Sequence, residues 1–136
     1  MTKSRNFATA VHIMTALACA ETLTSRVLAQ SIQTNPGLVR RVLAKLVRCG
    51  LVEAQRGKSG GSRLTRAPSS ISLREIYEAV EEGPLLRVSG KEPHSNCVVS
   101  RNIQGVLEDV FEDAEECLKK RLASVKLSSV VAEVRA

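Results

Sequence analysis

Side chains able to bind metals or form disulfides are few and far apart in this sequence. Four cysteines occur, spaced 30, 48 and 20 residues apart with no CxxC pair among them: Cys19, Cys49, Cys97 and Cys117. Disulfide frameworks and zinc ribbons both depend on closely paired cysteines. The sequence therefore predicts neither kind of scaffold.

The residues needed for catalysis are equally scattered. The only two histidines, His12 and His94, lie 82 positions apart, and no Ser-His-acid, Cys-His or paired-carboxylate arrangement occurs at motif spacing. The segment from Gly57 to Ser59 resembles the end of a phosphate-binding GxxxxGK(S/T) loop, but that motif requires glycine where Val52 stands. We therefore expect this chain not to be an enzyme.

Basic residues are the one strong chemical signal, because they are concentrated in one half of the chain. Residues 1–75 hold 12 lysines and arginines against three acids, a balance of +9. Residues 76–136 hold 8 against 11, a balance of −3, and the two halves together give the net charge of +6. A merely solubilising surface would not exclude acids so one-sidedly. The first half is predicted to face a polyanion and the second to have another task.

Length and composition narrow the class of protein further. A chain of 136 residues suits one domain with a substantial core. With 2% aromatic residues and no tryptophan, stacking of unpaired bases on aromatic side chains is not expected. No apolar run approaches the roughly 20 residues of a membrane span, and the start does not resemble a signal peptide. We expect a soluble, cytoplasmic protein without a membrane partner.

Helical periodicity and capping residues predict three helices in the basic half. The first covers roughly residues 5–20 and the second roughly residues 25–31. Asn35 and Pro36 suit the N-cap and the first turn of a third helix over residues 36–48.

A hairpin and a fourth helix follow. Two short extended runs, residues 51–56 and 62–65, flank a glycine-rich turn, which is typical of a β-hairpin. Ser72 and Glu75 form a capping box for a helix that ends near residue 81.

The C-terminal part begins with a loop over residues 83–97, which contains two prolines and two glycines. Residues 98–124 carry the longest helical pattern, and residues 127–134 predict a short final helix. We therefore expect a first domain over residues 1–82, this loop as a possible sensing region, and a helical segment with the C-terminal tail over residues 98–136.

Three short helices followed by a hairpin are typical of a winged helix-turn-helix domain, so the expected fold class is mainly α with a small β-hairpin wing. In such a domain the third helix enters the major groove of DNA, and the hairpin tip approaches phosphates or the adjacent minor groove. The predicted DNA contacts open the third helix or lie on it and on the wing: Asn35, Gly37, Arg40, Arg41, Lys45, Arg56, Lys58, Gly60, Gly61 and Arg63. For any one arginine a solvated helix face is an equal alternative, but the combination with the basic block favours DNA.

Several segments resemble the Rrf2 family of bacterial transcription regulators: LVRRVLAKLVRCGLV (residues 38–52), RGKSGG (56–61) and ISLREIYEAVE (71–81). The opening SRNFATAVHI, from Ser4, and the later NIQGVLE, from Asn102, are similar to the family too, so the resemblance covers nearly the whole chain. Ser4 and Arg5, in that opening, join the predicted DNA contacts.

The resemblance implies a homodimeric, sequence-specific repressor that binds a palindromic operator in double-stranded DNA. The family's DNA contacts fall on residues already singled out: Asn35, Gly37, Arg40, Arg41 and Arg56. It also implies a long C-terminal dimerisation helix, which suits seven apolar residues of the last long helical pattern: Ile103, Leu107, Val110, Phe111, Ala114, Leu118 and Leu122.

One departure from the family pattern concerns iron. Members that sense iron–sulfur status hold a cluster through three cysteines about six residues apart, in the loop before the dimerisation helix. Here Cys97 stands in that region, but Ile103 and Asp109 occupy the next two positions. Because a cluster normally takes four ligands, a single thiolate cannot hold one. We expect a member without cluster, metal or other cofactor.

Two hypotheses for the regulating signal remain open. In the first, Cys97 is a redox-responsive thiol, because its place just ahead of a helix start favours the thiolate; His94 lies nearby in the loop. In the second, an unidentified small-molecule effector binds between the first helix, the loop and the dimerisation helix. The other three cysteines lie on apolar or near-apolar helical stripes and are predicted to be core or interface residues, and His12 is predicted to be a hydrogen-bonded core residue.

Overall fold

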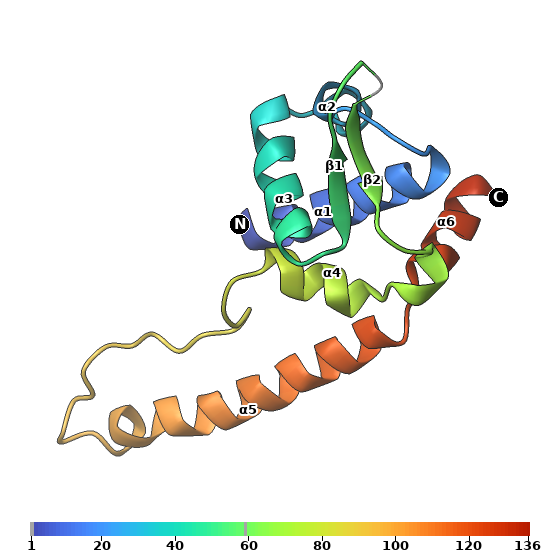
Figure 1. Cartoon of the computed structure of the whole chain (residues 1–136). Coiled ribbons are helices and arrows are strands. Elements are labelled where there is room, and N and C mark those ends of the chain that lie inside the picture. The colour runs from blue at the N-terminus through green and yellow to red at the C-terminus, as the bar shows by residue number, and fades with distance from the viewer. Residues whose placement is uncertain (1, 59) are drawn as a thin grey trace.

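The computed structural model describes residues 2–58 and 60–136, with side chains from Arg5 onward. In chain order the elements are α1 (Thr2–Cys19), α2 (Ser25–Ile32), α3 (Pro36–Arg48), β1 (Val52–Gln55), β2 (Gly61–Leu64), the 3-10 turn η1 (Pro68–Ser70), α4 (Leu73–Val80), α5 (Val98–Ala123) and α6 (Leu127–Arg135) (Figure 1). The expected class, mainly α with a hairpin wing, is confirmed. Among the described residues, no helix is both long and apolar enough to cross a lipid bilayer.

The core forms around α1, which packs against α2, α3, α4 and α6. Ile13 and Met14 of α1 are fully buried together with Leu28, Leu46 and Ile76 from α2, α3 and α4. Full burial of each such side chain contributes about 1.5–3 kcal/mol to folding. The helix-turn-helix and α4 are thus held as one body, and α3 is fixed against it.

The wing is an antiparallel pair, β1 and β2, with Val52 opposite Leu64 and Gln55 opposite Gly61. A third segment joins it: the amide of Leu23 donates to the Ser62 carbonyl at 3.1 Å, and the amide of Ser62 donates to the Leu23 carbonyl at 2.8 Å. A Cβ on Gly61, whose φ is 148°, would lie 2.5 Å from that Leu23 carbonyl oxygen. Gly61 is a predicted DNA contact, but the fold itself requires a glycine here. Without a Cβ, β2 can approach the segment at Leu23 closely enough to form these hydrogen bonds.

The chain returns to the first domain after α5. Leu127 is fully buried in the core, and its amide donates to the Ile71 carbonyl at 2.8 Å. The Leu73 amide donates to the Val125 carbonyl at 2.9 Å. The expected division grouped α6 with the long helix over residues 98–136, whereas α6 packs on α1 and η1.

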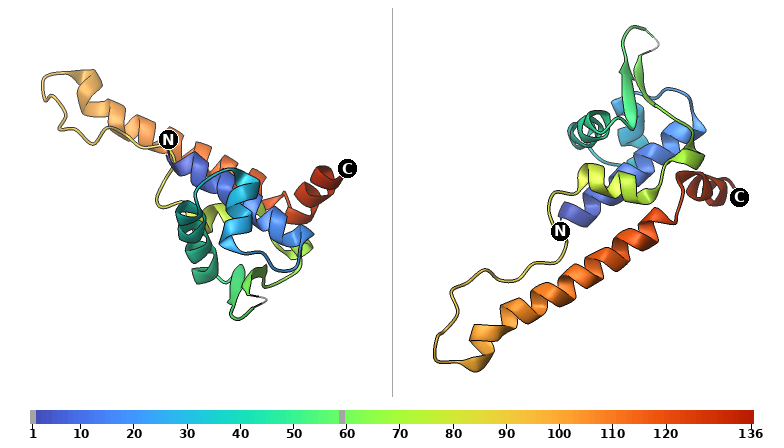
Figure 2. Two further views of the ribbon diagram at one scale, coloured as in Figure 1. Left: turned by 90° about the horizontal axis from the view of Figure 1, so that it is seen from above. Right: turned by 60° about the horizontal axis from the view of Figure 1, so that its bottom comes forward.

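α5 lies along the winged domain for only part of its length. It packs on α4, and its N-terminal half extends beyond the domain together with the loop over residues 83–97 (Figures 1 and 2). The views in Figure 2 show this projecting half as the longest extension of the molecule.

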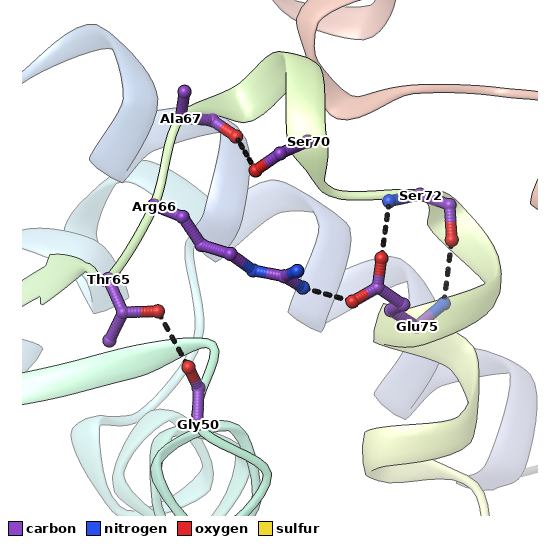
Figure 3. A network of polar contacts seen from close by, with 7 residues as sticks. All are labelled: Gly50, Thr65, Arg66, Ala67, Ser70, Ser72 and Glu75. Carbon is purple, nitrogen blue, oxygen red and sulfur yellow. Dashed lines mark hydrogen bonds and ion pairs between the residues drawn. The ribbon is translucent and has the colours of Figure 1, made fainter.

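A polar network ties the wing to α4 (Figure 3). Ser72 and Glu75 form the predicted capping box, since the Glu75 amide donates to the Ser72 hydroxyl at 3.2 Å and the Ser72 amide donates to the Glu75 carboxylate at 3.2 Å. The other carboxylate oxygen of Glu75 accepts from the guanidinium of Arg66, just after β2. Burial raises the pKa of Glu75, but the hydrogen bonds from Arg66 and Ser72 and the positive charges of Arg66 and Lys126 outweigh it, so the pKa lies below its usual value.

This lowered pKa predicts a stability difference that depends on pH. The ionised Glu75 contributes stability above its unfolded pKa of about 4.3, and the contribution is lost as pH falls through the lower folded-state pKa. We expect Glu75→Gln to reduce the free energy of unfolding by on the order of 1 kcal/mol at pH 7, since the pair is partly exposed. Urea unfolding at pH 7 and pH 3 measures the difference, which should shrink in acid. A difference independent of pH would contradict the assignment, and Glu133→Gln, at an exposed carboxylate of α6, is the control.

Candidate nucleic-acid interface

One side of α3 is free of the core and carries its basic residues. Successive residues of an α-helix turn by about 100°, so the following residues share one side, which we call the outer face of α3: Gly37, Arg40, Arg41, Ala44 and Arg48. Its arginines and Ala44 are exposed, whereas Val39, Val42, Leu43 and Leu46 on the other side are buried. Burial of these four apolar residues orients the helix and turns the outer face to solvent.

Local chemistry fixes the start of α3. The side-chain oxygen of Asn35 accepts from the Leu38 amide at 2.8 Å, as predicted for an N-cap, and Pro36 occupies the first turn. A Cβ on Gly37 would lie 3.0 Å from the capping oxygen, so a larger residue there would press on the cap. Asn35 and Gly37 thus have structural reasons for their presence beside their predicted role at DNA.

Arg40, Arg41 and Arg48 are available for an external partner. Within the part of the chain that the structure describes, none of them has a carboxylate within 4.0 Å or a side-chain hydrogen bond. The same holds for Arg56 and Lys58 at the wing, both exposed. Guanidinium and ammonium groups left in this state are suited to phosphates and to the acceptor edges of guanine.

Two of the predicted contacts are engaged within the chain instead. Lys45 is half-buried, and its Nζ lies 3.4 Å from both the Val80 carbonyl oxygen and Oε1 of Glu82. Nε of Arg63 donates to Oε1 of Glu53, directly opposite in the hairpin, at 2.6 Å. Lys45 thus ties α3 to the end of α4, and Arg63 ties β2 to β1. Neither side chain is unpaired in the way that Arg40, Arg41 and Arg48 are.

The hairpin tip and the start of α3 lie at the same end of the domain, whereas α1 begins near the opposite end of α3 (Figures 1 and 2). Arg5 is exposed and lies near the start of α1, so it is away from the wing tip. The side chain of Ser4 is outside the described residues. At the tip, a Cβ on Gly60 would lie 2.7 Å from the carbonyl oxygens of Gln55 and Gly57, so Gly60 allows the turn to close.

Two outer-face residues were absent from the predicted set. Ala44 lies at the centre of the face, between the arginines, and Arg48 lies one turn further along. Extending the spacing of Gly37, Arg40 and Arg41 by one helical turn would have found both. A small residue at the centre permits close approach to a groove, and an alanine methyl group can contact the methyl group of thymine.

Cys97 caps α5. Its Sγ accepts from the Ser100 amide at 3.4 Å, and the His94 amide donates to the Ser100 hydroxyl at 2.6 Å, which places both predicted sensor residues in one turn.

Cys19, Cys49 and Cys117 are exposed, so the prediction that they belong to the core is wrong for the single chain. His12 is exposed too, so its predicted place in the core is wrong, but it is hydrogen-bonded: its Nε2 lies 2.9 Å from the hydroxyl of Ser31 on α2.

The apolar residues of α5 lie on two different sides. Leu107, Phe111, Leu118 and Leu122 are half-buried within the chain, although the sequence predicts them all as dimer contacts. The other predicted contacts, Ile103, Val110 and Ala114, are exposed. Four residues spaced by three and four form what we call the exposed stripe: Val99 (66% exposed), Ile103 (42%), Val106 (57%) and Val110 (54%).

The donor atoms present do not fit a metal ion or an iron–sulfur cluster. The four cysteines lie at the ends of α1 and α3, at the cap of α5 and within α5, and each is exposed. No group of three or more His, Cys, Asp or Glu residues in the described chain is placed to hold a metal ion. Clusters need several converging thiolates, and the described chain does not bring its cysteines together in this way.

A helix-turn-helix with a hairpin wing and a third helix of unpaired arginines defines the class of winged-helix DNA-binding proteins. The model of the Rrf2 family, described as an iron-dependent transcriptional regulator, matches residues 3–133. The "Putative HTH-type transcriptional regulator YwnA" of Bacillus subtilis strain 168 is 34% identical over 124 residues, 91% of this chain and 92% of that protein. The chain belongs to the Rrf2 family of DNA-binding transcriptional regulators.

Solved structures share the architecture. A "putative DNA binding protein" is 31% identical with a TM-score of 0.74, covering 92% of this chain and 97% of its own. CymR, the global cysteine regulator of B. subtilis, has the same fold at 22% identity and a TM-score of 0.69, covering 98% of this chain and 95% of its own.

Proposed function

We propose that this chain is a homodimeric repressor that binds a palindromic operator in double-stranded DNA. The observation that carries the proposal is the outer face of α3, with unpaired Arg40, Arg41 and Arg48, at the wing that presents Arg56 and Lys58. In the dimer, two copies of this face enter successive major grooves, about 10 bp apart from centre to centre. Occupation of an operator that overlaps a promoter excludes the polymerase, so loss of the protein should raise transcription of the gene it controls.

The exposed stripe of α5 supports dimerisation through a second copy of this chain. The N-terminal half of α5 has no winged domain beside it, and helices in water owe most of their stability to packing of an apolar face. Apolar residues at spacings of three and four are typical of a helix that packs on another helix. Two α5 helices packed through this stripe would place the outer faces of α3 on two half-sites.

Separate effects of helix and wing test the mode of DNA binding. Arg40→Ala or Arg41→Ala should relax preference at one base position, at a cost of roughly 1–3 kcal/mol for a bidentate contact. Lys58→Ala should weaken binding to all sequences alike and flatten the salt dependence, because its expected partner is a phosphate. Selection of operators from random duplexes, followed by affinity measurements at several salt concentrations, distinguishes the two effects. Unchanged base preference in both arginine variants would exclude α3 as the element that reads sequence.

We further propose that Cys97 makes DNA binding sensitive to oxidants in this cluster-free member. Cys97 is exposed at the N-terminus of α5, and its Sγ accepts from the Ser100 amide at 3.4 Å, so oxidation of the sulfur would disturb this helix cap. Cys97→Ser keeps a good helix cap and removes the redox chemistry, so it should abolish any loss of operator affinity caused by peroxide. Cys19→Ser, at another exposed cysteine, should respond as the parent does.

The measurement uses protein purified without oxygen, whose absorbance spectrum should lack the visible bands of an iron–sulfur cluster. A brown protein would overturn the cluster-free assignment. Equal peroxide responses of the Cys97→Ser variant and the parent would overturn the sensor assignment and leave a small-molecule effector as the signal.

A further inference from the structure

An open cavity of about 900 Å³ lies between α4, the first part of the loop over residues 83–97 and α5. Ligand pockets in proteins commonly have volumes of about 300–1,000 Å³. Apolar side chains from all three elements line part of its wall: Tyr77, Pro84, Leu86, Val88 and Phe111. The cavity belongs neither to the outer face of α3 nor to the exposed stripe of α5.

Tyr77 brings to this cavity a polar group that lacks a partner. The residue is only 6% exposed, and its ring packs edge-on against Phe7 with 5.2 Å between ring centroids. Its hydroxyl is buried and has no hydrogen-bond partner among the described residues. Buried hydroxyls are normally satisfied, so this one indicates a partner that comes from outside the chain.

The surroundings of that hydroxyl favour its neutral form. Burial, together with the negative charges of Glu115 and Glu81, raises the pKa of Tyr77. Both glutamates also line the cavity. The neutral hydroxyl is thus a hydrogen-bonding group beside carboxylates, in a region where negative charge prevails.

The cavity wall carries an excess of negative charge. Two basic residues, Arg87 and Lys119, line it together with six acidic ones: Glu78, Glu81, Glu108, Glu112, Glu115 and Glu116. Glu78 is paired with Arg74 at 3.4 Å and with Lys119 at 4.0 Å, and Oε1 of Glu115 accepts from the Leu85 amide at 2.6 Å. In the described part of the chain, Glu108, Glu112 and Glu116 have no ion pair. Such a wall attracts cations and repels anions.

The lining favours an organic cation over a metal ion. No set of three His, Cys, Asp or Glu donors converges in the described residues, as a metal ion would require. Aromatic faces and carboxylates together are the groups that recognise substituted ammonium ions. We propose that this cavity binds a small organic cation, an ammonium group on an apolar body, with Glu112 facing its charge, Phe111 packing on its body and Tyr77 hydrogen-bonded to it.

This site remains open when two α5 helices pair. At about 100° per residue, Glu112 and Glu115 project from the side of α5 opposite Val106 and Val110, and Phe111 lies on the flank between the two sides. A ligand in the cavity bridges α4, which packs on α3, and α5, which carries the exposed stripe. Binding of the cation is measured without DNA, so a negative result would not affect the proposed role as a DNA-binding repressor.

The single tyrosine of the chain makes a direct test possible. Protein with ¹³C-labelled tyrosine rings gives ring resonances from Tyr77 alone, and benzylammonium, whose N–H groups can donate to the Tyr77 hydroxyl, serves as the probe. We expect a saturable shift of these resonances with this cation, at least tenfold weaker binding of neutral benzyl alcohol, and no saturable shift with benzoate. Absence of a saturable shift with the cation, or equal binding of the cation and the alcohol, would overturn the proposal.

Matched variants assign the binding to the cavity. Glu112→Gln should weaken binding of benzylammonium at least fivefold, whereas Glu133→Gln, at an exposed position on α6, should leave it unchanged. Calorimetric titration of Tyr77→Phe should show weaker binding than the parent, because the hydroxyl is lost. Thermal unfolding checks that each variant is folded. Parent-like affinity of Glu112→Gln would exclude this cavity as the binding site.

Discussion

Replacing Ala44 by glutamate is expected to abolish operator binding while leaving the fold intact. Ala44 is exposed at the centre of the outer face of α3, between Arg40, Arg41 and Arg48, and its side chain holds no part of the core. A carboxylate there would oppose the DNA phosphates and occupy space that the groove needs. We expect affinity to fall by at least 100-fold, about 2.8 kcal/mol, in fluorescence anisotropy with the selected operator.

The stability of this variant should be close to that of the parent. Glutamate is nearly as good a helix former as alanine, and the site is solvent-exposed, so Tm should change little. Ala132→Glu, at an exposed position on α6, is the matched control and should keep both affinity and Tm. Parent-like operator binding by Ala44→Glu would show that DNA does not approach this side of α3.

Two glutamates in the exposed stripe are expected to convert the dimer into monomers. Val106 and Val110 are 57% and 54% exposed in the single chain, so Val106→Glu/Val110→Glu removes little intramolecular packing. In a symmetric helix pair both substitutions occur twice, and burying four unpaired carboxylates costs far more than the interface gains. Sedimentation velocity should show a single species of monomer mass.

Operator binding by the double variant should fall as well, by a factor of ten or more. Each winged domain keeps its outer face of α3, but the second half-site is no longer occupied as an intramolecular event. The matched control is Val134→Glu, which changes a valine 65% exposed at the end of α6 and should leave the dimer unchanged. A dimer that persists in the double variant would place the subunit contact on another surface.

Local chemistry made much of the fold predictable from the sequence. Asn35 and Pro36 begin α3, and Ser72 with Glu75 begins α4, because a helix start is decided by residues within three or four positions of it. The bounds of the hairpin follow for a similar reason, since glycines mark its turn. The arginines on the outer face of α3 were predictable because helical spacing separates them from buried valines and leucines.

Contacts between distant segments were not predictable in this way. The segment at Leu23 that joins the wing, and the engagement of Lys45 with the end of α4, depend on which parts of the chain meet in three dimensions. The apolar residues of α5 were assigned to one interface, although they form two sides, one half-buried in the chain and one exposed. Pattern alone does not say which side finds its partner within the chain.

The attachment of α5 at its C-terminal end has a mechanical consequence. Its 26 residues span about 39 Å, yet among the residues that the structure describes only the end near Leu127 is held to the winged domain by backbone hydrogen bonds. In the proposed dimer each α5 is therefore a rigid arm, joined to its own winged domain by these bonds and by packing on α4. A small change of angle between the two α5 helices would move each winged domain through a much larger arc and change the distance between the two recognition helices. DNA, with its fixed helical repeat, accepts only one such distance, so the angle between the two α5 helices decides whether both half-sites are bound at once.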